Sequence, residues 1–541
     1  MALTAERKIP VLCLYLCSAI WAQEPLRITT RIIELDVVVT DGKGHQVEGL
    51  TLDDFTITEK GKRQKIANFA VQDLRTPNAK PFNLPTGIYT NHFGLLNIGR
   101  SRVSIILFDL LNMRPADCAS GRQQLLKFLR EEVRPDDRIG IYTLSSQLRV
   151  LHEFTEDTRE LISAVTHLDR GSSPLVDFLA DGSDPAASPG QNVAQAKPVD
   201  RIQLTTSALE AIAKRVAGLP GRKTLVWISA GFPFSTIDTY DGVKRNAMPA
   251  VSEPPALVGA PRVGAPAVPR PDNSEYRTFG PEIQRVARAM NTSNIAIYSV
   301  DAQGLVPPGA APASMSKWFH SKRDTMRTFA ESTGGRAFFD NNNLEAAIGT
   351  AIDETRFIYV LSYYPSDGQW DGHFQEVKVT VNQRGAVVRH RPDYLALPEG
   401  LDGDENRQDR ESALGAAIAS PLEQTGIRMV AGVSRNMPSP GRLTLRLTMD
   451  PRDVQLIEKD GRWKGLLDVA YVQQPGQRYP AQIARDRYNF DFMPDMFAKI
   501  QERGVIIEKE LDMSASRYHL KVVVRAVSTG ATGSIEIRTR E

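Results

Sequence analysis

Unbroken apolar strands alternate with helical patterns between residues 101 and 356, and this rhythm constrains the possible fold more than any other feature. The stretch "VSIILFDL" from Val103 to Leu110 has no polar alternation, which indicates a strand buried on both faces of a parallel sheet. Helical spacing follows from Asp117 to Val133, and similar strand–helix pairs recur as far as Arg356. The order predicts a doubly wound, Rossmann-type α/β domain with helices on both faces.

Two β-rich segments border this α/β domain. Residues 27–75 contain short alternating strands, and residues 357–397 contain three more with Asp-Gly turns. Neither set is large enough to be stable alone, and both lie beside the ends of the α/β domain. We therefore expect them to complete one β-sandwich, with residues 76–100 as a linker rich in Pro, Asn and Gly.

The last part of the chain is predicted to form a second β unit. Residues 398–410 form a charged linker rich in Gly and Asp, and a short helix is expected from Glu411 to Ala419. From Met429 onward the pattern is almost wholly that of strands. Residues 411–541 are therefore predicted to be an immunoglobulin-like β-sandwich.

Length and charge limit the classes of protein that fit. A chain of 541 residues is long for one core, so about two to four domains are expected. The net charge is +2 and no basic stripe occurs, which argues against a nucleic-acid partner. The segments 182–200 and 234–279 are rich in Pro and Ala, and are interpreted as surface insertions in the α/β domain.

The N-terminus is typical of an export signal. Residues 1–22 contain a basic start at Arg7, an apolar run, and a small residue before a polar stretch. A lipoprotein signal would cleave before Cys17, but the bulky residue before it does not fit that rule. We expect export to the periplasm or the extracellular space, with no later membrane span. Cys118 is then the one cysteine of the mature chain, so no intramolecular disulfide is expected.

Ordered motifs in the α/β segment resemble a known family. The stretches are "SIILFDLLN", "DRIGIYTLSSQLRVLHEFTED", "LDRGSSPLVDFL" and "KTLVWISAGFPF". They resemble the strands and loops of the von Willebrand factor type A (VWA) domain. From Arg27 to Leu397, "VVVTDGKGHQVEGLTLDDFTITEKGKRQKI", "FDLLN" and "YVLSYYPSDGQWDGHFQEVKVTV" are similar to secreted VWFA-related proteins of the acidobacterial type. The resemblance implies a protein-binding or adhesion module whose partner is a protein or a surface polymer.

The resemblance also implies where a divalent metal would bind. VWA domains hold it with an Asp-x-Ser-x-Ser loop, a threonine and a distant aspartate. Asp109 matches the first aspartate, but Leu111 and Met113 stand at the serine positions, and Ala230 stands at the second aspartate. Ser173 matches the threonine. Asp109 and Ser173 are therefore the candidate metal ligands of a degenerate site, and no magnesium or other divalent cofactor is expected.

A structural role for Asp109 is the favoured interpretation. Its carboxylate would accept backbone N–H bonds in the loop or cap the following helix, while Leu111 and Met113 pack beneath the loop. If the alignment with the metal-binding motif were shifted by one residue, Asn112 or Ser229 would stand at a ligand position, but that alignment fits the motif less well.

The sequence indicates no catalytic residues and no cofactor-binding residues. The 8 histidines form no His-x-x-x-His pair, and neither a Gly-x-Ser-x-Gly elbow nor a phosphate-binding loop occurs. Asp53-Asp54 and Asp136-Asp137 are interpreted as solvated turn residues. The main hypothesis is an exported non-enzymatic binding module. The alternatives are a structural part of an envelope assembly and an exported hydrolase, which would need a nucleophile–base pair.

Overall fold

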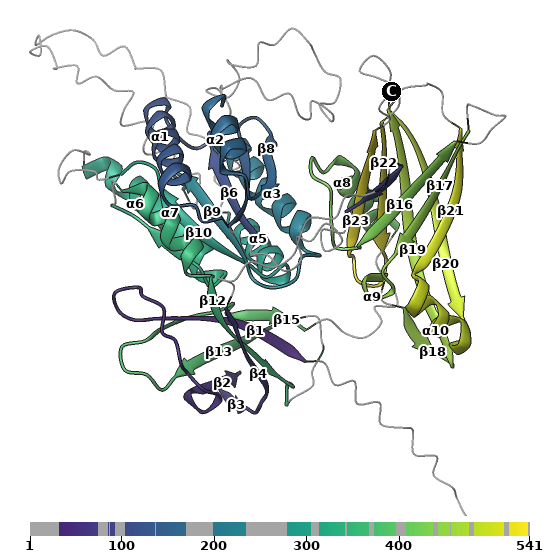
Figure 1. Cartoon of the computed structure of the whole chain (residues 1–541), viewed down its shortest axis with the longest axis horizontal. Helices are drawn as coiled ribbons and strands as arrows, with labels where there is room; N and C mark the ends of the chain where they lie inside the picture. Colours follow the sequence, from purple (N-terminus) through teal and green to yellow (C-terminus); the bar gives the residue numbers. More distant parts are fainter. Residues whose placement is uncertain are drawn as a thin grey trace, which may run out of the picture.

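The computed structural model consists of an α/β unit and two β units (Figure 1). The signal segment 1–22, Ser173 and most of the insertion 234–279 lie outside the residues that the structure describes. The described residues are 32–73, 85, 87–91, 103–135, 137–168, 198–233, 279–304, 313–340, 343–366, 370, 373–396, 407–435, 442–454, 456–474, 481–512 and 519–538.

The α/β unit is built on a six-stranded sheet with the order β11-β10-β9-β6-β7-β8. The central strands β10, β9, β6 and β7 run parallel and are buried along their full length, as their apolar runs predict. The strands are β6 (Val103–Asp109), β7 (Arg138–Leu144), β8 (Leu148–Thr155), β9 (Lys223–Ser229), β10 (Ile295–Asp301) and β11 (Arg336–Phe338).

Helices cover both faces of this sheet, which agrees with the predicted mixed α/β architecture (Figure 1). One face packs against α1 (Pro115–Glu131), α2 (Thr158–Thr166) and α7 (Leu344–Asp353). The other face packs against α3 (Pro198–Val216), α5 (Gly280–Thr292) and α6 (Ala313–Ser332).

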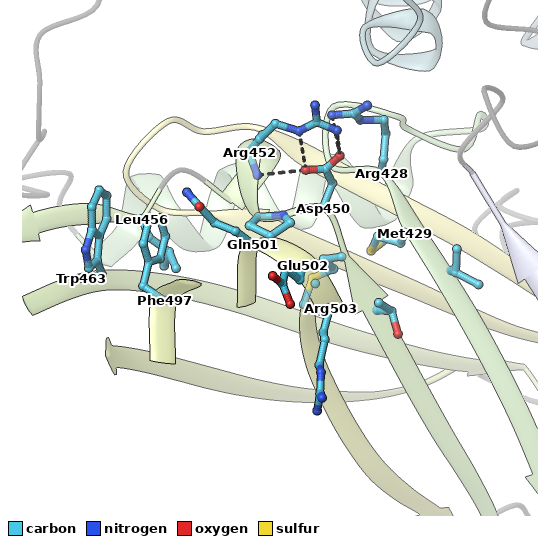
Figure 2. A pocket seen from close by; sticks show the side chains of 15 residues that line it. Arg428, Met429, Asp450, Arg452, Leu456, Trp463, Phe497, Gln501, Glu502 and Arg503 are labelled. Carbon is cyan, nitrogen blue, oxygen red and sulfur yellow. Dashed lines mark hydrogen bonds and ion pairs between the residues drawn. The ribbon is translucent and has the colours of Figure 1, made fainter. Parts of the chain in front are cut away.

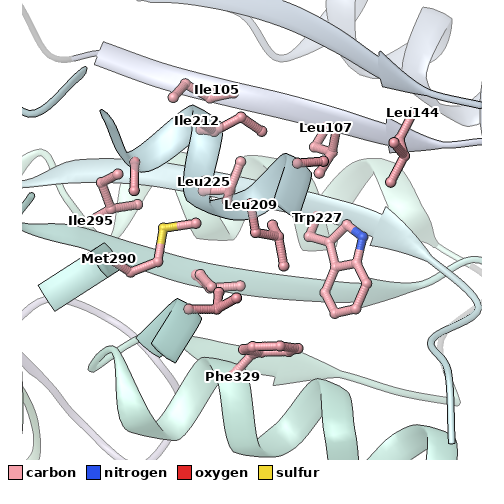
Figure 3. Close-up of a cluster of buried hydrophobic side chains, with 14 of the residues drawn as sticks. Ile105, Leu107, Leu144, Leu209, Ile212, Leu225, Trp227, Met290, Ile295 and Phe329 are labelled. Atoms are coloured by element: carbon pink, nitrogen blue, oxygen red, sulfur yellow. The ribbon is translucent and has the colours of Figure 1, made fainter. Parts of the chain in front are cut away.

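Trp227 belongs to the core that packs against α3, α5 and α6. It is fully buried, and its ring meets that of Phe329 edge to face, with centroids 5.7 Å apart at 82° (Figure 3). Leu107, Leu209 and Leu225 belong to the same cluster (Figure 3). Each fully buried side chain of this size stabilises the fold by about 1.5–3 kcal/mol. Trp227 therefore fixes α6 against β9 near the carboxyl end of the sheet.

The edge strand β8 was not predicted as a separate element. It pairs antiparallel with β7, and its residues are mostly half-buried. Such an edge lacks the continuous apolar run of the central strands, so its sequence signal is weak. The predicted helix after it is present as α2, and Asp157 caps it by accepting a hydrogen bond from the Arg159 N–H at 2.9 Å.

The early and late β segments lie together in two four-stranded sheets, ordered β14-β1-β12-β4 and β15-β13-β2-β3. Both sheets contribute side chains to one apolar core. The α/β unit therefore begins and ends between strands of this sandwich. The strands are β1 (Ile33–Thr40), β2 (Phe55–Glu59), β3 (Lys62–Gln64), β4 (Ile66–Asp73), β12 (Phe357–Tyr363), β13 (Phe374–Val381), β14 (Val387–Arg389) and β15 (Asp393–Leu395).

The C-terminal unit is also formed by two facing sheets around one core, but its immunoglobulin-like character stays a prediction. One sheet has the order β21-β17-β16-β5, and the other contains β18, β19, β22 and β23 with β20 on the outer side of β19. The elements are α8 (Arg407–Ala419), β16 (Met429–Arg435), β17 (Arg442–Met449), α9 (Pro451–Val454), β18 (Ile457–Lys459), β19 (Arg462–Gln474), β20 (Gln482–Phe492), α10 (Pro494–Arg503), β21 (Val505–Asp512), β22 (His519–Ala526) and β23 (Thr532–Arg538).

The prediction that residues 76–100 form only a linker is wrong. β5 (Ile88–Thr90) lies within that segment and pairs antiparallel with β16 of the C-terminal unit. Three residues are too few to show a period, so their pairing is set by the distant strand and not by local sequence. The prediction of almost pure strand after Met429 is also wrong at α10, whose residues Phe497 and Ile500 pack against the core of the sandwich.

A buried ion pair joins the C-terminal unit to the α/β unit. The Arg215 guanidinium donates to Glu423 at 2.9 Å and to Glu153 at 3.0 Å. Beside it, the Gly218 N–H donates to the Thr425 hydroxyl at 2.8 Å. Arg215 is 4% exposed, so losing either partner would leave a buried charge poorly compensated.

Asn91 anchors β5 to the C-terminal unit. Its buried carboxamide donates to the carbonyl oxygens of Gln424 at 2.7 Å and Ile427 at 2.9 Å, and accepts from the Met429 N–H at 2.7 Å. Replacing Asn91 with alanine leaves these backbone groups without their partner. We expect Asn91→Ala to lower the free energy of unfolding by about 2–4 kcal/mol, with faster hydrogen exchange in β16.

The exposed residue Asn489 on β20 offers a matched control for this experiment. Asn489→Ala should leave both urea unfolding and the exchange of β16 unchanged. Equal behaviour of the two variants would contradict an anchoring role for Asn91.

Candidate functional site

Three strands bring polar side chains to the carboxyl edge of the α/β sheet. Asp109 ends β6, Ser229 ends β9 and Asp301 ends β10. Asp301 lies opposite Ser229 in the parallel pairing of β10 with β9. Since ligands of open α/β sheets bind outside the carboxyl ends of the strands, this edge is the candidate functional site. We call it the strand-end edge.

Four hydrogen bonds from neutral groups hold the Asp109 carboxylate. Oδ2 accepts from the Asn112 amide at 2.8 Å, the Ser229 hydroxyl at 2.8 Å and the Trp227 indole at 3.1 Å. Oδ1 accepts from the Asn112 backbone N–H at 3.1 Å. Asp109 itself is fully buried. The carboxylate is thus compensated by protein donors without a counter-charge in direct contact.

The hydrogen bonds continue outward from Asp109 to α3. The Asn112 amide also donates to the Thr205 hydroxyl at 2.8 Å, which donates to the Arg201 carbonyl at 2.8 Å. The Arg201 guanidinium donates to the Leu111 carbonyl oxygen. This network fixes the loop after β6 against the first turns of α3, so the position of Asp109 depends on both elements.

The side chains at the serine positions of the motif point into apolar cores. Leu111 is 2% exposed and packs with the core around Trp227, whereas Met113 is 7% exposed and packs with the core on the other face. Ala230 is likewise buried. The packing of Leu111 and Met113 beneath the loop agrees with the structural interpretation of Asp109. The other candidate ligand, Ser173, lies outside the described residues.

Asn112 and Ser229 lie beside Asp109, as the shifted frame of the motif would place them. Their polar hydrogens, however, are directed at the Asp109 carboxylate, and the Ser229 oxygen accepts the Gly231 N–H at 3.0 Å. Trp227, which also contacts Asp109, was not predicted from the motif. In the part of the chain that the structure describes, no group of three His, Cys, Asp or Glu side chains could hold a metal ion.

Cationic side chains surround the two aspartates of this edge. Asp301 accepts from the Gln303 N–H at 3.0 Å and pairs with Arg323 at 3.4 Å. Lys322, which precedes Arg323 in α6, is buried, and burial lowers the pKa of its ammonium to about 8. The charge of Arg201 adds to this lowering, while Asp301 opposes it. The edge therefore carries paired charges, Arg323 with Asp301 among them, near a carboxylate whose hydrogen bonds come from protein groups.

The paired carboxylates found in the sequence have structural roles here. Asp54 accepts from the backbone and hydroxyl of Thr51, at 2.7 Å and 2.9 Å, in a capping box. The expectation of a solvated turn is wrong for Asp137, which is 2% exposed and accepts two bonds from Arg356 at 2.9 Å and 2.7 Å. Its partner lies 219 residues away, which local sequence could not show.

Comparison with protein-family models and with curated proteins gives no match. Among solved structures, an aerotolerance-related membrane protein from Bacteroides fragilis is 13% identical over 47% of this chain and 98% of its own, with a TM-score of 0.24. BatB from Bacteroides thetaiotaomicron is 11% identical over 47% and 98%, with a TM-score of 0.23. The vWF domain of the type V pili tip protein Mfa5 from Porphyromonas gingivalis is 14% identical over 47% and 94%, also at 0.23.

The described part of the chain contains no helix that is long and apolar enough to cross a membrane.

Burial raises the pKa of the Asp109 carboxyl above its ordinary value of 3.8, although its hydrogen bonds act in the opposite direction. A carboxyl whose pKa is higher in the folded state is harder to ionise there than in the unfolded chain. Its contribution to stability is therefore lost as the pH rises from about 3.8 through the raised pKa. We expect the stability of the wild type relative to Asp109→Asn to decrease across that window and to level off above it.

Urea unfolding at a series of pH values measures this difference. Asp460→Asn, at an exposed turn, serves as the control for a change of net charge. If the difference between wild type and Asp109→Asn did not depend on pH, Asp109 would not have a raised pKa.

Proposed function

We propose that this chain is an exported, non-enzymatic binding module built on a VWA-like domain, which contacts its partner at the strand-end edge without a metal bridge. The observation that carries the proposal is the Asp109 carboxylate, whose two oxygens accept four hydrogen bonds from neutral protein groups. A divalent metal would need these oxygens, together with further oxygen ligands.

The surroundings of Asp109 support a degenerate metal site. Leu111 and Met113 offer carbon and thioether sulfur where a hard cation would need hydroxyl oxygens, and both are buried in apolar cores. The Ser229 hydroxyl donates to Asp109 and already accepts the Gly231 N–H, and the Asn112 amide nitrogen donates to Asp109, so both side chains are engaged within the protein. We therefore expect no magnesium at this edge, and Ser173 has no metal-binding role in the proposal.

The arginines at the edge indicate the kind of partner group that it would attract. Arg114 is 69% exposed at the start of α1 although it pairs with Asp117, and Arg323 of α6 pairs with Asp301 and Asp340, with Lys322 buried beside it. In VWA domains with a metal, the cation attracts an acidic group of the partner. Here the protein's own cations would supply that attraction, and the partner would be a protein or a surface polymer with acidic groups. Nucleic acid is not the expected partner, because the chain has nearly balanced charge overall.

A structural role in an envelope assembly is the second candidate, and the connections between the units favour it. β5 enters the C-terminal sheet before the α/β unit begins, and Arg215 ties the two units together. Such ties restrict domain motion, as a load-bearing or scaffolding part would require. Both candidates place the protein in the periplasm or outside the cell, as the N-terminal segment 1–22 predicts.

Calorimetric titration with magnesium and with manganese tests the metal-free site. Because the Asp109 oxygens are occupied by protein donors, we expect no micromolar binding of either ion to the wild type. Asp109→Ala is the matched variant. Micromolar binding to the wild type that disappears in Asp109→Ala would contradict the proposal.

A second test compares two arginines at opposite ends of α1. Arg114 lies at the strand-end edge, whereas the exposed Arg130 lies in the last turn of the same helix. After cross-linking in an envelope extract, we expect Arg114→Ala to reduce partner capture by roughly three- to tenfold, as for a rim charge worth about 1 kcal/mol. Arg130→Ala should capture as the wild type does.

The same capture experiment should give equal yields with added magnesium and with a metal chelator. Loss of capture in the chelator, or an equal loss in Arg130→Ala and Arg114→Ala, would count against metal-free binding at this edge.

A further inference from the structure

A second concave site lies in the C-terminal sandwich, away from the strand-end edge. A cavity of about 760 Å³ opens at the end of the sandwich where β16 and β19 begin and β17 ends (Figure 2). The helices α9 and α10 form part of its walls. This volume is within the range of small-molecule binding sites. Nothing in the proposed function uses this cavity.

One end of the cavity is aromatic and apolar. Trp463 and Phe497 are stacked with their ring centroids 3.7 Å apart and their planes at 7°, and Leu456 lies next to them (Figure 2). Both rings are only half-buried, so part of this aromatic surface faces the cavity. Such a surface would cover the apolar face of a ligand.

The upper wall in Figure 2 consists of charged side chains that form ion pairs with one another. Asp450 pairs with Arg452 at 2.7 Å and with Arg428 at 2.9 Å, and Arg428 also donates to Asp453 at 2.7 Å. The hydrogen bond from Arg452 lowers the pKa of Asp450 to about 2, so the pair stays charged at any physiological pH. This wall presents fixed donors and acceptors while its charges cancel.

The opposite wall supplies polar groups that are not engaged with the protein. Gln501, Glu502 and Arg503 are consecutive, exposed residues at the end of α10, and all three line the cavity. Within the described residues, no ion pair and no side-chain hydrogen bond involves them. Together they offer an amide donor and acceptor, a carboxylate acceptor and guanidinium donors.

Gly504 holds these two walls at a fixed separation. Its φ of 85° lies in the left-handed region, and a Cβ there would lie 2.8 Å from the Thr448 methyl group and 2.9 Å from the Met449 carbonyl oxygen. Only glycine lets α10 end this close to β17. The cavity is therefore formed before any ligand binds, which reduces the entropy cost of binding.

The lining selects against several classes of ligand. A phosphate or another strong anion would find one unpaired cation, Arg503, directly beside Glu502. A purely apolar ligand would cover the polar walls without satisfying them. A molecule with one apolar face and many hydroxyl groups matches both parts, because hydroxyl groups can donate to a carboxylate and accept from an amide or a guanidinium.

From this lining we infer that the C-terminal sandwich binds a neutral saccharide, with the sugar face on the Trp463 end and the hydroxyl groups toward Gln501, Glu502 and Arg503. The site is separate from the strand-end edge and does not depend on the function proposed for it. With both sites, one chain would contact a partner through the α/β unit and a neutral glycan through the C-terminal unit.

The test uses the full chain and an array of neutral oligosaccharides built on glucose, galactose, mannose and N-acetylglucosamine. We expect binding to at least one of them, followed by calorimetry and tryptophan fluorescence with the bound oligosaccharide. Glu502→Ala and Gln501→Ala should each weaken that binding at least tenfold. Since the ligand is neutral, added salt should change the affinity of the wild type by less than twofold.

Gln482→Ala is the matched control, because Gln482 is exposed at the far end of the same sandwich and does not line the cavity. Unchanged melting of all three variants shows that the fold is intact. The inference is overturned if no neutral oligosaccharide binds, or if Gln482→Ala weakens binding as much as Glu502→Ala. Binding of an unstructured peptide with the same dependence on Glu502, in place of saccharide, would also overturn it.

Discussion

The compensation of one buried carboxylate determines how the strand-end edge is built. Asp109 has no contact with water, and an unpaired charge there would cost several kcal/mol. The structure meets this cost with neutral donors from β9 and from the loop after β6, and not with a metal. Trp227 links this polar centre to the apolar core, since its indole N–H reaches Asp109 while its ring packs on Phe329. The chemistry of the edge and the packing of the sheet thus depend on the same residues.

Local sequence was sufficient to predict the strands that are completely buried. The strands β6, β7, β9 and β10 are buried along their full length, and their continuous apolar runs could be recognised without knowledge of their neighbours. Local sequence was insufficient to predict β8, which is half-buried at the edge of its sheet. It was also insufficient to predict β5, whose three residues form a strand only because β16 is beside them. The helix α10 was missed because it interrupts a region of otherwise strong strand pattern.

The candidate site could be predicted in outline but not in its contacts. The position of Asp109 at the end of a buried strand followed from sequence, as did the burial of Leu111 and Met113. Its donors Trp227 and Ser229 are 118 and 120 residues away, and only the pairing of β6 with β9 brings them together. Asp301, like Asp109, is an acidic residue at the end of an apolar strand. It was not predicted as a site residue because it belongs to no recognised motif. The cavity of the C-terminal unit left no signal, since its walls come from five separate stretches of the chain.

The strand pairings have a consequence for the order in which the chain acquires its structure. β1 pairs with β12, and Thr90 of β5 reaches the Met429 carbonyl across 339 residues. At ordinary rates of synthesis, the early strands would wait on the order of tens of seconds for these partners. During that time their unpaired edges would be open to aggregation. A chain with this topology therefore gains by staying unfolded until its late strands have been synthesised.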